Sequence, residues 1–292
     1  MIRKPVWFKV PPPWGQRFAA VDGLLRAEGL NTVCRSALCP NIGECYNRGT
    51  ATFLLMGNLC TRHCGYCNIP GGRPTNPPDP TEPERLGRAV KAMSLRHAVL
   101  TSVTRDDVPD GGAAHFAASI RAIAQASPGV TVEVLIPDLN GDEEALAVVL
   151  AARPAILNHN IETVRALFPR VRPGGDYDRS LALLAASRRL APEIPTKSGL
   201  LVGLGETPEQ LETTLRDLAQ VGCRIVTVGQ YLRPPGGTAE LVRYYTPEEF
   251  AELKRRALAL GFEHVESGPL VRSSYHAESH AGHAEVRRAV GS

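Results

Sequence analysis

From about residue 50 onward, short apolar runs alternate with longer amphipathic stretches. The runs have the length of buried strands and lie at 52–57, 97–103, 130–136, 155–161, 196–203 and 224–232. The stretches have the spacing of helices with one apolar face and lie at 82–95, 113–126, 142–152, 178–190, 208–221 and 247–260. Strands that alternate with helices predict β–α–β crossovers and a parallel sheet.

Two of the helices carry clear start signals. Thr207 and Thr246 each precede a proline and acidic residues, in "TPEQLETTL" and "TPEEFAELKRRA". A threonine hydroxyl can accept a hydrogen bond from the first turn, and proline suits the first helical position because it lacks an N–H. We therefore expect both threonines to be N-caps.

Six strands are too few for a complete eight-unit barrel, but they suit a partial barrel or a doubly wound sheet. We expect an α/β fold with a partial (β/α)6 barrel of the TIM type over residues 51–268. Residues 1–50 form a largely irregular N-terminal extension with one helix at 17–29, closed by Gly29. Residues 269–292 form a C-terminal tail.

Six of the 7 cysteines lie within 34 consecutive residues, in two groups of three. In a reducing compartment such clusters indicate metal ligands rather than disulfides. One group is C-x3-C-x2-C, in "CTRHCGYC": Cys60, Cys64 and Cys67. It follows the first predicted strand, where a barrel places its active site. The other group is C-x4-C-x5-C: Cys34, Cys39 and Cys45.

Three cysteines leave one iron of a four-iron cube without a thiolate. An open iron can bind a small molecule through an amine and a carboxylate and pass it an electron. Zinc is the alternative, because Cys60, His63, Cys64 and Cys67 could supply a Cys3His set. His63 and Cys64 are adjacent in sequence, however, which is a poor geometry for one tetrahedron.

Charge and hydropathy exclude some classes of protein. The net charge is only +3 and no dense run of Lys and Arg is present, so nucleic acid binding is not indicated. No stretch approaches the roughly 18 uninterrupted apolar residues of a membrane span. The N-terminus has no apolar signal-peptide segment. We therefore expect a cytoplasmic protein with no membrane partner.

The first cysteine pattern resembles the signature of the radical S-adenosylmethionine enzymes. The two patterns together closely resemble the lipoyl synthase family. Further blocks that are similar to this family follow in its order: "LTSVTRDDVPDGGAAHF", "VEVLIPDLNG", "NHNIETV", "TKSGLLVGLGE", "GQYLRP" and "SGPLVRSSYHAE". The resemblance covers residues from about 30 to 278.

The resemblance implies a sulfurtransferase. Lipoyl synthases insert two sulfur atoms at C6 and C8 of an octanoyl chain that is amide-linked to a lysine of a carrier domain. The carriers are the glycine cleavage H protein and the E2 subunits of 2-oxoacid dehydrogenases. Each C–S bond consumes one S-adenosylmethionine, which one electron cleaves to a 5′-deoxyadenosyl radical. An electron donor such as ferredoxin or flavodoxin is therefore implied.

The resemblance also implies two [4Fe-4S] clusters. Cys60, Cys64 and Cys67 would hold the catalytic cluster. An auxiliary cluster, dismantled as the sulfur source, would be held by Cys34, Cys39, Cys45 and a serine of "RSSY", either Ser274, which we favour, or Ser273. The extension and the tail would hold this cluster over the barrel mouth. S-adenosylmethionine contacts are expected from residues at strand ends: Thr101, Ser102, Arg105, Gly111, Gly112 and Asn160.

Other residues receive structural interpretations. His159 is expected to be a satisfied core residue without an acid–base role, Cys223 to pack as a small apolar residue, and Lys197 to be exposed. The family usually has Gln where Arg233 stands, so the role of this position is open. The alternative functions are another radical enzyme with an auxiliary cluster, and a non-catalytic iron–sulfur or zinc protein.

Overall fold

The computed structural model describes residues 3–48, 50–275 and 277. The chain folds as two compact units. The N-terminal unit comprises residues 10–62 and 68–157, apart from residue 49. The C-terminal unit holds the described residues of 1–9, 63–67 and 158–292.

The N-terminal unit is built on strands that pair in chain order. β1 (Asn31–Thr32) is antiparallel to β2 (Thr52–Leu55), which runs parallel to β3 (His97–Ser102). β3 is parallel to β4 (Thr131–Leu135). β5 (Ile156–Asn158) starts in this unit, where the Ala155 N–H donates to Val132 O at 2.7 Å. All residues of β2 are buried, which explains why its sequence is an uninterrupted apolar run.

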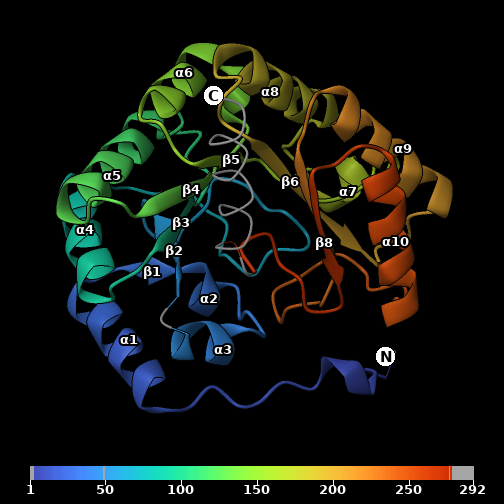
Figure 1. Cartoon of the computed structure of the whole chain (residues 1–292), viewed down its shortest axis with the longest axis horizontal. Helices are drawn as coiled ribbons and strands as arrows, with labels where there is room; N and C mark the ends of the chain where they lie inside the picture. Colours follow the sequence, from blue (N-terminus) through green and yellow to red (C-terminus); the bar gives the residue numbers. More distant parts are fainter. Residues whose placement is uncertain (1–2, 49, 276, 278–292) are drawn as a thin grey trace. The chain divides into compact units, whose positions relative to one another are not determined.

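Helices connect these strands and precede them. α4 (Glu82–Ala92), α5 (Ala113–Ala126) and α6 (Glu143–Ala151) alternate with the strands, and α4 and α5 lie side by side (Figure 1). Asp142 caps α6 by accepting from the N–H groups of Glu144 and Ala145. The elements before β2 are α1 (Gln16–Ala27), α2 (Val33–Ser36) and α3 (Ile42–Asn47), and a 3-10 turn, η2 (Leu139–Gly141), follows β4.

The C-terminal unit repeats the same alternation. β6 (Thr196–Val202), β7 (Ile225–Gln230) and β8 (His264–Gly268) are parallel and pair in chain order. The helical elements are η1 (Val6–Phe8), η3 (Arg165–Leu167), α7 (Phe168–Val171), α8 (Tyr177–Leu190), α9 (Pro208–Gln220) and α10 (Pro247–Ala259). Thr207 and Thr246 each form a capping box with proline next to them in the first turn, which confirms both predicted helix starts.

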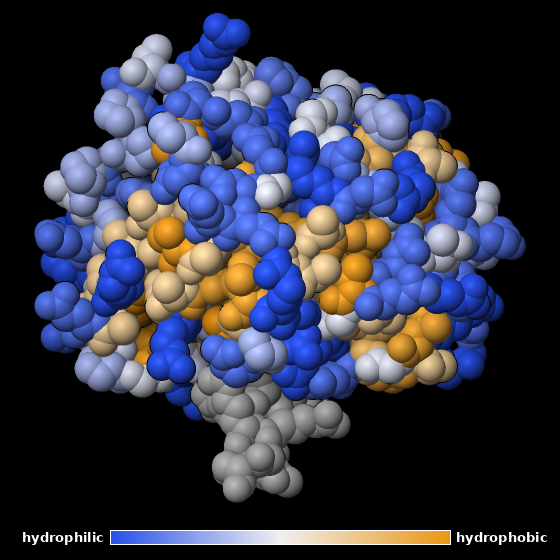
Figure 2. Space-filling view, turned by 90° about the horizontal axis from the view of Figure 1, so that it is seen from above, coloured by the Kyte–Doolittle hydropathy of each residue, from blue (hydrophilic) through white to orange (hydrophobic). Residues whose placement is uncertain are grey.

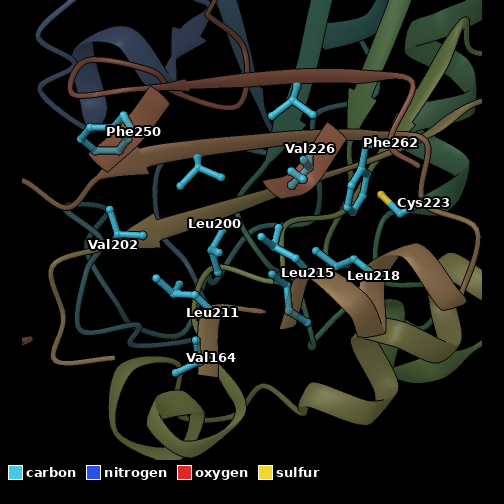
Figure 3. Close-up of a cluster of buried hydrophobic side chains, with 14 of the residues drawn as sticks. Val164, Leu200, Val202, Leu211, Leu215, Leu218, Cys223, Val226, Phe250 and Phe262 are labelled. Atoms are coloured by element: carbon cyan, nitrogen blue, oxygen red, sulfur yellow. The ribbon is translucent and has the colours of Figure 1, made fainter. Parts of the chain in front are cut away.

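The core of the C-terminal unit lies between its strands and its helices. Leu200 and Val202 from β6 pack with Leu211 and Leu215 from α9 and with Phe250 from α10 (Figure 3). Cys223 belongs to the same cluster and is 5% exposed. Burial raises the pKa of its thiol to about 12, so the prediction that it packs as an apolar residue is confirmed.

The predicted α/β class is confirmed. In each unit the parallel strands follow in chain order with no reversal, which is the connectivity of a (β/α) barrel rather than of a doubly wound sheet. The six predicted strands correspond to β2 to β7. The sequence analysis missed β1, β8 and the short helices α2 and α3. Gly29 follows α1 with a φ of 62°, as expected of a residue that closes a helix.

The surface carries some large apolar side chains. Figure 2 shows hydrophobic residues gathered between hydrophilic ones on the face in view. Among the described residues, Trp14 is 72% exposed and Leu38 is 58% exposed. Over the same part of the chain, none of the helices has the length and apolar character that crossing a membrane requires.

The buried cluster of the C-terminal unit gives a stability prediction. Leu215 is fully buried, and its truncation to alanine leaves a cavity that should lower the free energy of unfolding by about 2–5 kcal/mol. Leu258 in α10 is 46% exposed, so Leu258→Ala should cost less than about 0.5 kcal/mol. Urea unfolding followed by circular dichroism measures both, and equal losses would contradict this description of the core.

Candidate active site

The "CTRHCGYC" segment begins shortly after β2 ends and belongs to both units. Cys60 to Arg62 lie in the N-terminal unit, and His63 to Cys67 lie in the C-terminal unit. The backbone turns sharply before the segment, because Met56 and Gly57 adopt φ angles of 63° and 94°. The two halves of the motif are therefore held by different sets of neighbours.

Cys60 is held by backbone hydrogen bonds on both sides and at its sulfur. Its N–H donates to Pro70 O at 2.9 Å, and its carbonyl accepts from Gly72 N at 2.8 Å. The Cys60 Sγ accepts from the backbone N–H groups of Arg62 at 3.4 Å and Thr104 at 3.3 Å. N–H groups that point at a sulfur stabilise a thiolate, so this environment fits an iron-bound cysteine.

Arg62, inside the cysteine motif, is a residue that the sequence analysis missed. Its guanidinium donates to Asp106, Asp138 and Asn140, and its side chain is 7% exposed. Burial works against the charged form, but the hydrogen bonds to Asp138 and Asp106 outweigh it and raise the pKa of Arg62. The sequence gives no local signal that Arg62 binds these two carboxylates, because Asp106 and Asp138 are 44 and 76 residues away from it along the chain.

The second half of the motif depends on a glycine. The Gly65 N–H donates to Val171 O at 2.8 Å, and its carbonyl accepts from Thr238 N and Ala239 N, both at 2.9 Å. A Cβ at position 65 would lie 2.9 Å from Thr238 Oγ1 and 3.1 Å from Ala239 N. Glycine therefore allows this close approach. Cys67 N then donates to Cys64 O at 3.0 Å and closes a turn between the two cysteines.

Tyr66, between the last two cysteines, contacts a set of polar residues in the C-terminal unit. Burial and then the negative charge of Glu162 raise the pKa of Tyr66 well above its ordinary value. Burial also raises the pKa of Glu162, although Arg172 and hydrogen bonds from Asn160 and Tyr66 oppose this. The positive charge of Arg272 in the "RSSY" tail acts on Glu162 as well. Arg272 and Tyr66 therefore both act on the Glu162 carboxylate.

Asn160 is the one predicted cofactor contact in the C-terminal unit. Its Nδ2 donates to Glu162 Oε1 at 3.0 Å. Its Oδ1 is buried and has no hydrogen-bond partner within the described part of the chain. A buried acceptor without a partner is costly, so this oxygen fits a polar ligand that donates to it.

The predicted contacts at the end of β3 have different environments. Ser102 Oγ is buried and, among the described residues, has no partner, which suits a ligand contact. Thr101 Oγ1 donates to Leu135 O of β4 at 2.9 Å. Arg105 donates to Asp107, Met56 O and Asn76 O, so its guanidinium fixes the surrounding loops.

Packing and backbone conformation explain why positions 111 and 112 of "DGG" are glycines. Gly111 and Gly112 adopt φ angles of 61° and 93°, which disfavour other residues. A Cβ on Gly112 would lie 2.4 Å from Met56 Cε, and one on Gly111 would lie 3.1 Å from Leu139 Cδ2. The side chains of Met56 and Leu139 therefore lie beside these two glycines. A cofactor contact at either glycine stays a prediction.

The second cysteine group surrounds a buried thiol. Cys34 lies in α2 and Cys45 in α3, and the Cys39 N–H donates to Cys34 O at 3.1 Å. Burial, followed by the neighbouring Cys39 and Cys45, raises the pKa of Cys34 to about 12. Cys39 and Cys45 thus both act on the Cys34 thiol. Three thiolates together need a cation, so this donor set fits an iron–sulfur cluster.

Other contacts within the N-terminal unit hold this cysteine group in place. Asn68, next after Cys67, donates from Nδ2 to Ser36 O at 2.9 Å. The hydroxyls of Thr32 and Tyr46 hydrogen-bond at 2.8 Å in the interior. β1 pairs with β2, so the segment that carries Cys34 is anchored on the first strand of the parallel sheet.

The start of the C-terminal tail is anchored in the C-terminal unit. The Val271 N–H donates to Gly268 O at 3.2 Å, and a Cβ on Gly229 of β7 would lie 2.1 Å from Val271 O. Ser273 and Ser274 follow and are half-buried. Closure of the auxiliary cluster by either serine would join residues from both units, and it stays a prediction. Residues 276 and 278–292 of the predicted tail lie outside the described residues.

Several single-residue expectations can be assessed. The prediction that Lys197 is exposed was wrong: it lies in β6 and is fully buried, because its strand is covered on both faces. His159 is fully buried and its Nε2 pairs with the Ser180 hydroxyl at 3.1 Å, as expected of a core residue. Arg233 Nε donates to Gly237 O at 3.1 Å, which gives this position a role in its own loop.

Among the described residues, no group of three or more His, Cys, Asp or Glu side chains is arranged around a single metal ion. A four-iron cube is ligated at separate iron atoms, so its ligands need not surround one shared ion.

Comparisons with known proteins show the family of the chain. The sequence profile of the Radical SAM superfamily matches residues 54–218. The lipoyl synthase of Chlorobaculum parvum is 54% identical over 277 residues, which cover 95% of this chain and 94% of that protein. The lipoyl synthase of Rubrobacter xylanophilus is 52% identical over 288 residues, 99% of this chain and 89% of that protein.

The fold is similar to that of the crystal structure of methylornithine synthase. The TM-score is 0.56 at 15% sequence identity, over 76% of this chain and 72% of that chain. At this identity the likeness concerns the fold alone, and it agrees with the partial barrel described above. The near full-length identity to lipoyl synthases is more specific: the chain belongs to the lipoyl synthase family of sulfurtransferases, within the radical SAM superfamily.

Proposed function

We propose that this chain inserts two sulfur atoms, at C6 and C8, into an octanoyl group that is amide-linked to a lysine of a lipoyl carrier domain. The observation that supports this most directly is the second cysteine group, in which Cys34 lies in α2, Cys45 lies in α3 and the Cys39 N–H donates to Cys34 O. A radical enzyme that needed only its catalytic cluster would have no use for three further clustered thiols.

Each cysteine group would hold one [4Fe-4S] cluster. Cys60, Cys64 and Cys67 ligate the catalytic cluster and leave one iron for the amino acid end of S-adenosylmethionine. The auxiliary group, with Ser274 or Ser273 as fourth ligand, holds the other cluster. When bound, the clusters supply the electron that cleaves the sulfonium and the sulfur that the substrate receives. Serine oxygen is a harder ligand than thiolate, which suits a cluster that must be dismantled.

The polar residues near the motif orient S-adenosylmethionine. Ser102 and Asn160 each have a buried polar atom without a hydrogen-bond partner among the described residues. Thr101, Arg105 and the glycines 111 and 112 hold the strand ends in shape through contacts with their own chain. We propose that the first two residues bind the cofactor directly and that the others also line its site.

The partners follow from the chemistry of the family, which acts on lipoyl carrier proteins. We propose the glycine cleavage H protein and the E2 subunits of 2-oxoacid dehydrogenases as carriers. Because each cleavage of S-adenosylmethionine consumes one electron, a low-potential donor such as ferredoxin or flavodoxin is needed. We place the reaction in the cytoplasm, where free thiols remain reduced before cluster assembly.

Turnover of an octanoyl-lysine peptide tests the proposed function. The reconstituted chain, with S-adenosylmethionine and a reductant, should release 5′-deoxyadenosine and convert the peptide to the dithiol product, detected by mass spectrometry. The same peptide with acetyl-lysine is the control and should gain no sulfur. Release of 5′-deoxyadenosine with no sulfur in the octanoyl peptide would favour the alternative, a different radical enzyme with an auxiliary cluster.

The two cysteine groups should have separable roles. Cys34→Ala removes an auxiliary ligand, so S-adenosylmethionine cleavage should remain within about twofold of the unmodified chain while sulfur insertion is abolished, since ligand loss is expected to prevent cluster assembly. Cys223→Ala is the matched control, because Cys223 packs in the hydrophobic core of the C-terminal unit, and it should retain both activities. Loss of cleavage in Cys34→Ala would refute the division of roles.

The serine ligand can be identified by a pair of variants. Ser274→Ala should lower sulfur insertion roughly tenfold or more and speed loss of auxiliary iron to a chelator, because one iron loses its protein ligand. Ser273→Ala should leave both close to the unmodified values. The reverse pattern would assign the ligand to Ser273. If neither variant had an effect, the hypothesis that a tail serine ligates the auxiliary cluster would be rejected.

A further inference from the structure

Arg62 forms a dense set of buried hydrogen bonds between the first two cysteines of the motif. Its Nε and Nη2 donate to the two oxygens of Asp106 at 3.0 and 2.8 Å. Its Nη1 and Nη2 donate to the two oxygens of Asp138 at 2.9 and 2.7 Å. Nη2 also donates to Asn140 Oδ1 at 2.8 Å. We call these four residues the Arg62 clamp.

The shape of the clamp requires arginine. A planar guanidinium can donate in parallel pairs to two carboxylates at once, whereas a lysine ammonium acts as a point charge. The Asp138 side chain is fully buried and that of Asp106 is 33% exposed. Removing the guanidinium would leave at least one buried carboxylate without its counter-charge, which is strongly unfavourable.

The clamp joins segments that follow two different strands. Asp106 lies just after β3, and Asp138 lies just after β4, where it also accepts the Asn140 N–H at 3.3 Å. Thr61 strengthens the first connection, because its hydroxyl donates to Thr104 O at 3.0 Å and to Asp106 at 2.7 Å. All of these residues belong to the N-terminal unit.

The same contacts orient two backbone N–H donors toward the sulfur of Cys60. The Arg62 N–H and the Thr104 N–H both point at Cys60 Sγ. Thr104 is in turn tied to Thr61, since Thr61 N donates to Thr104 O at 3.0 Å. The position of the Cys60 thiol therefore depends on contacts among Thr61, Arg62 and the loop after β3. The Arg62 clamp holds both Arg62 and this loop in place.

We propose that Arg62 is a positioning residue for the catalytic cluster: through Asp106 and Asp138 it preforms the Cys60 half of the motif before any cluster binds. The proposal rests on the assignment of Cys60 as a cluster ligand, but not on the identity of the substrate. Every contact that it uses is made by the polypeptide itself. The clamp thus reduces the ordering that cluster binding must impose on this half of the motif.

Hydrogen exchange of the cluster-free full-length chain tests this proposal. Arg62→Ala should raise the exchange of amides in residues 58–62 and 104–107 by on the order of tenfold or more, because these segments lose their shared anchor. Exchange in α6 of the same unit should not change. Arg62→Lys keeps the charge but loses the paired donors, and it should raise exchange at the same amides by a smaller factor.

Arg88→Ala is the matched control, because Arg88 pairs with Glu28 in the same unit but is 57% exposed. It should leave exchange at both segments unchanged. Unchanged exchange in Arg62→Ala would overturn the proposal. So would a uniform rise through the N-terminal unit in both Arg62 variants, since that outcome indicates general destabilisation rather than local positioning.

A second readout follows the cluster itself. In a background of Cys34→Ala, Cys39→Ala and Cys45→Ala, only the catalytic group remains. Adding Arg62→Ala should speed cluster loss to an iron chelator several-fold, measured by absorbance, whereas adding Arg88→Ala should not. Equal rates would contradict a positioning role. Neither readout requires sulfur insertion, so failure of the proposed function would be seen separately, in the peptide assay.

Discussion

A cube of four irons that receives three cysteines must take its fourth ligand from elsewhere, and the proposed function of this chain rests on that constraint. Both cysteine groups have three members, and the remaining cysteine, Cys223, is buried in a hydrophobic core where it serves packing. In the proposed function, the open iron of one cluster binds a small-molecule cofactor and that of the other binds a tail hydroxyl. The same shortage of thiolates would then permit two different chemical roles.

The fold holds these groups by contacts that do not depend on metal. In the N-terminal unit, parallel strands bring the segments after β3 and β4 to one edge, where Arg62 binds them to the Cys60 segment. In the C-terminal unit, Gly65 is fixed against Val171 and Ala239, and Tyr66 meets Glu162. The tail start is packed on β7 through Gly229. Each cysteine segment therefore has its own protein framework.

Sequence reasoning succeeded where the signal is local. The caps at Thr207 and Thr246, the apolar strand runs and the cysteine spacings are all determined by residues within a few positions of one another. It failed where the partner is distant. Arg62 gave no signal because Asp138 is 76 residues away. Lys197 was misplaced because its burial comes from the elements that cover β6.

We propose that each cysteine group leaves one iron to a ligand other than cysteine. Anomalous diffraction at the iron edge from crystals of the anaerobically reconstituted chain tests this proposal. Two four-iron sites are expected, one bound by Cys60, Cys64 and Cys67 and the other by the remaining trio with a serine oxygen. A single site, or a fourth cysteine at either cluster, would contradict it.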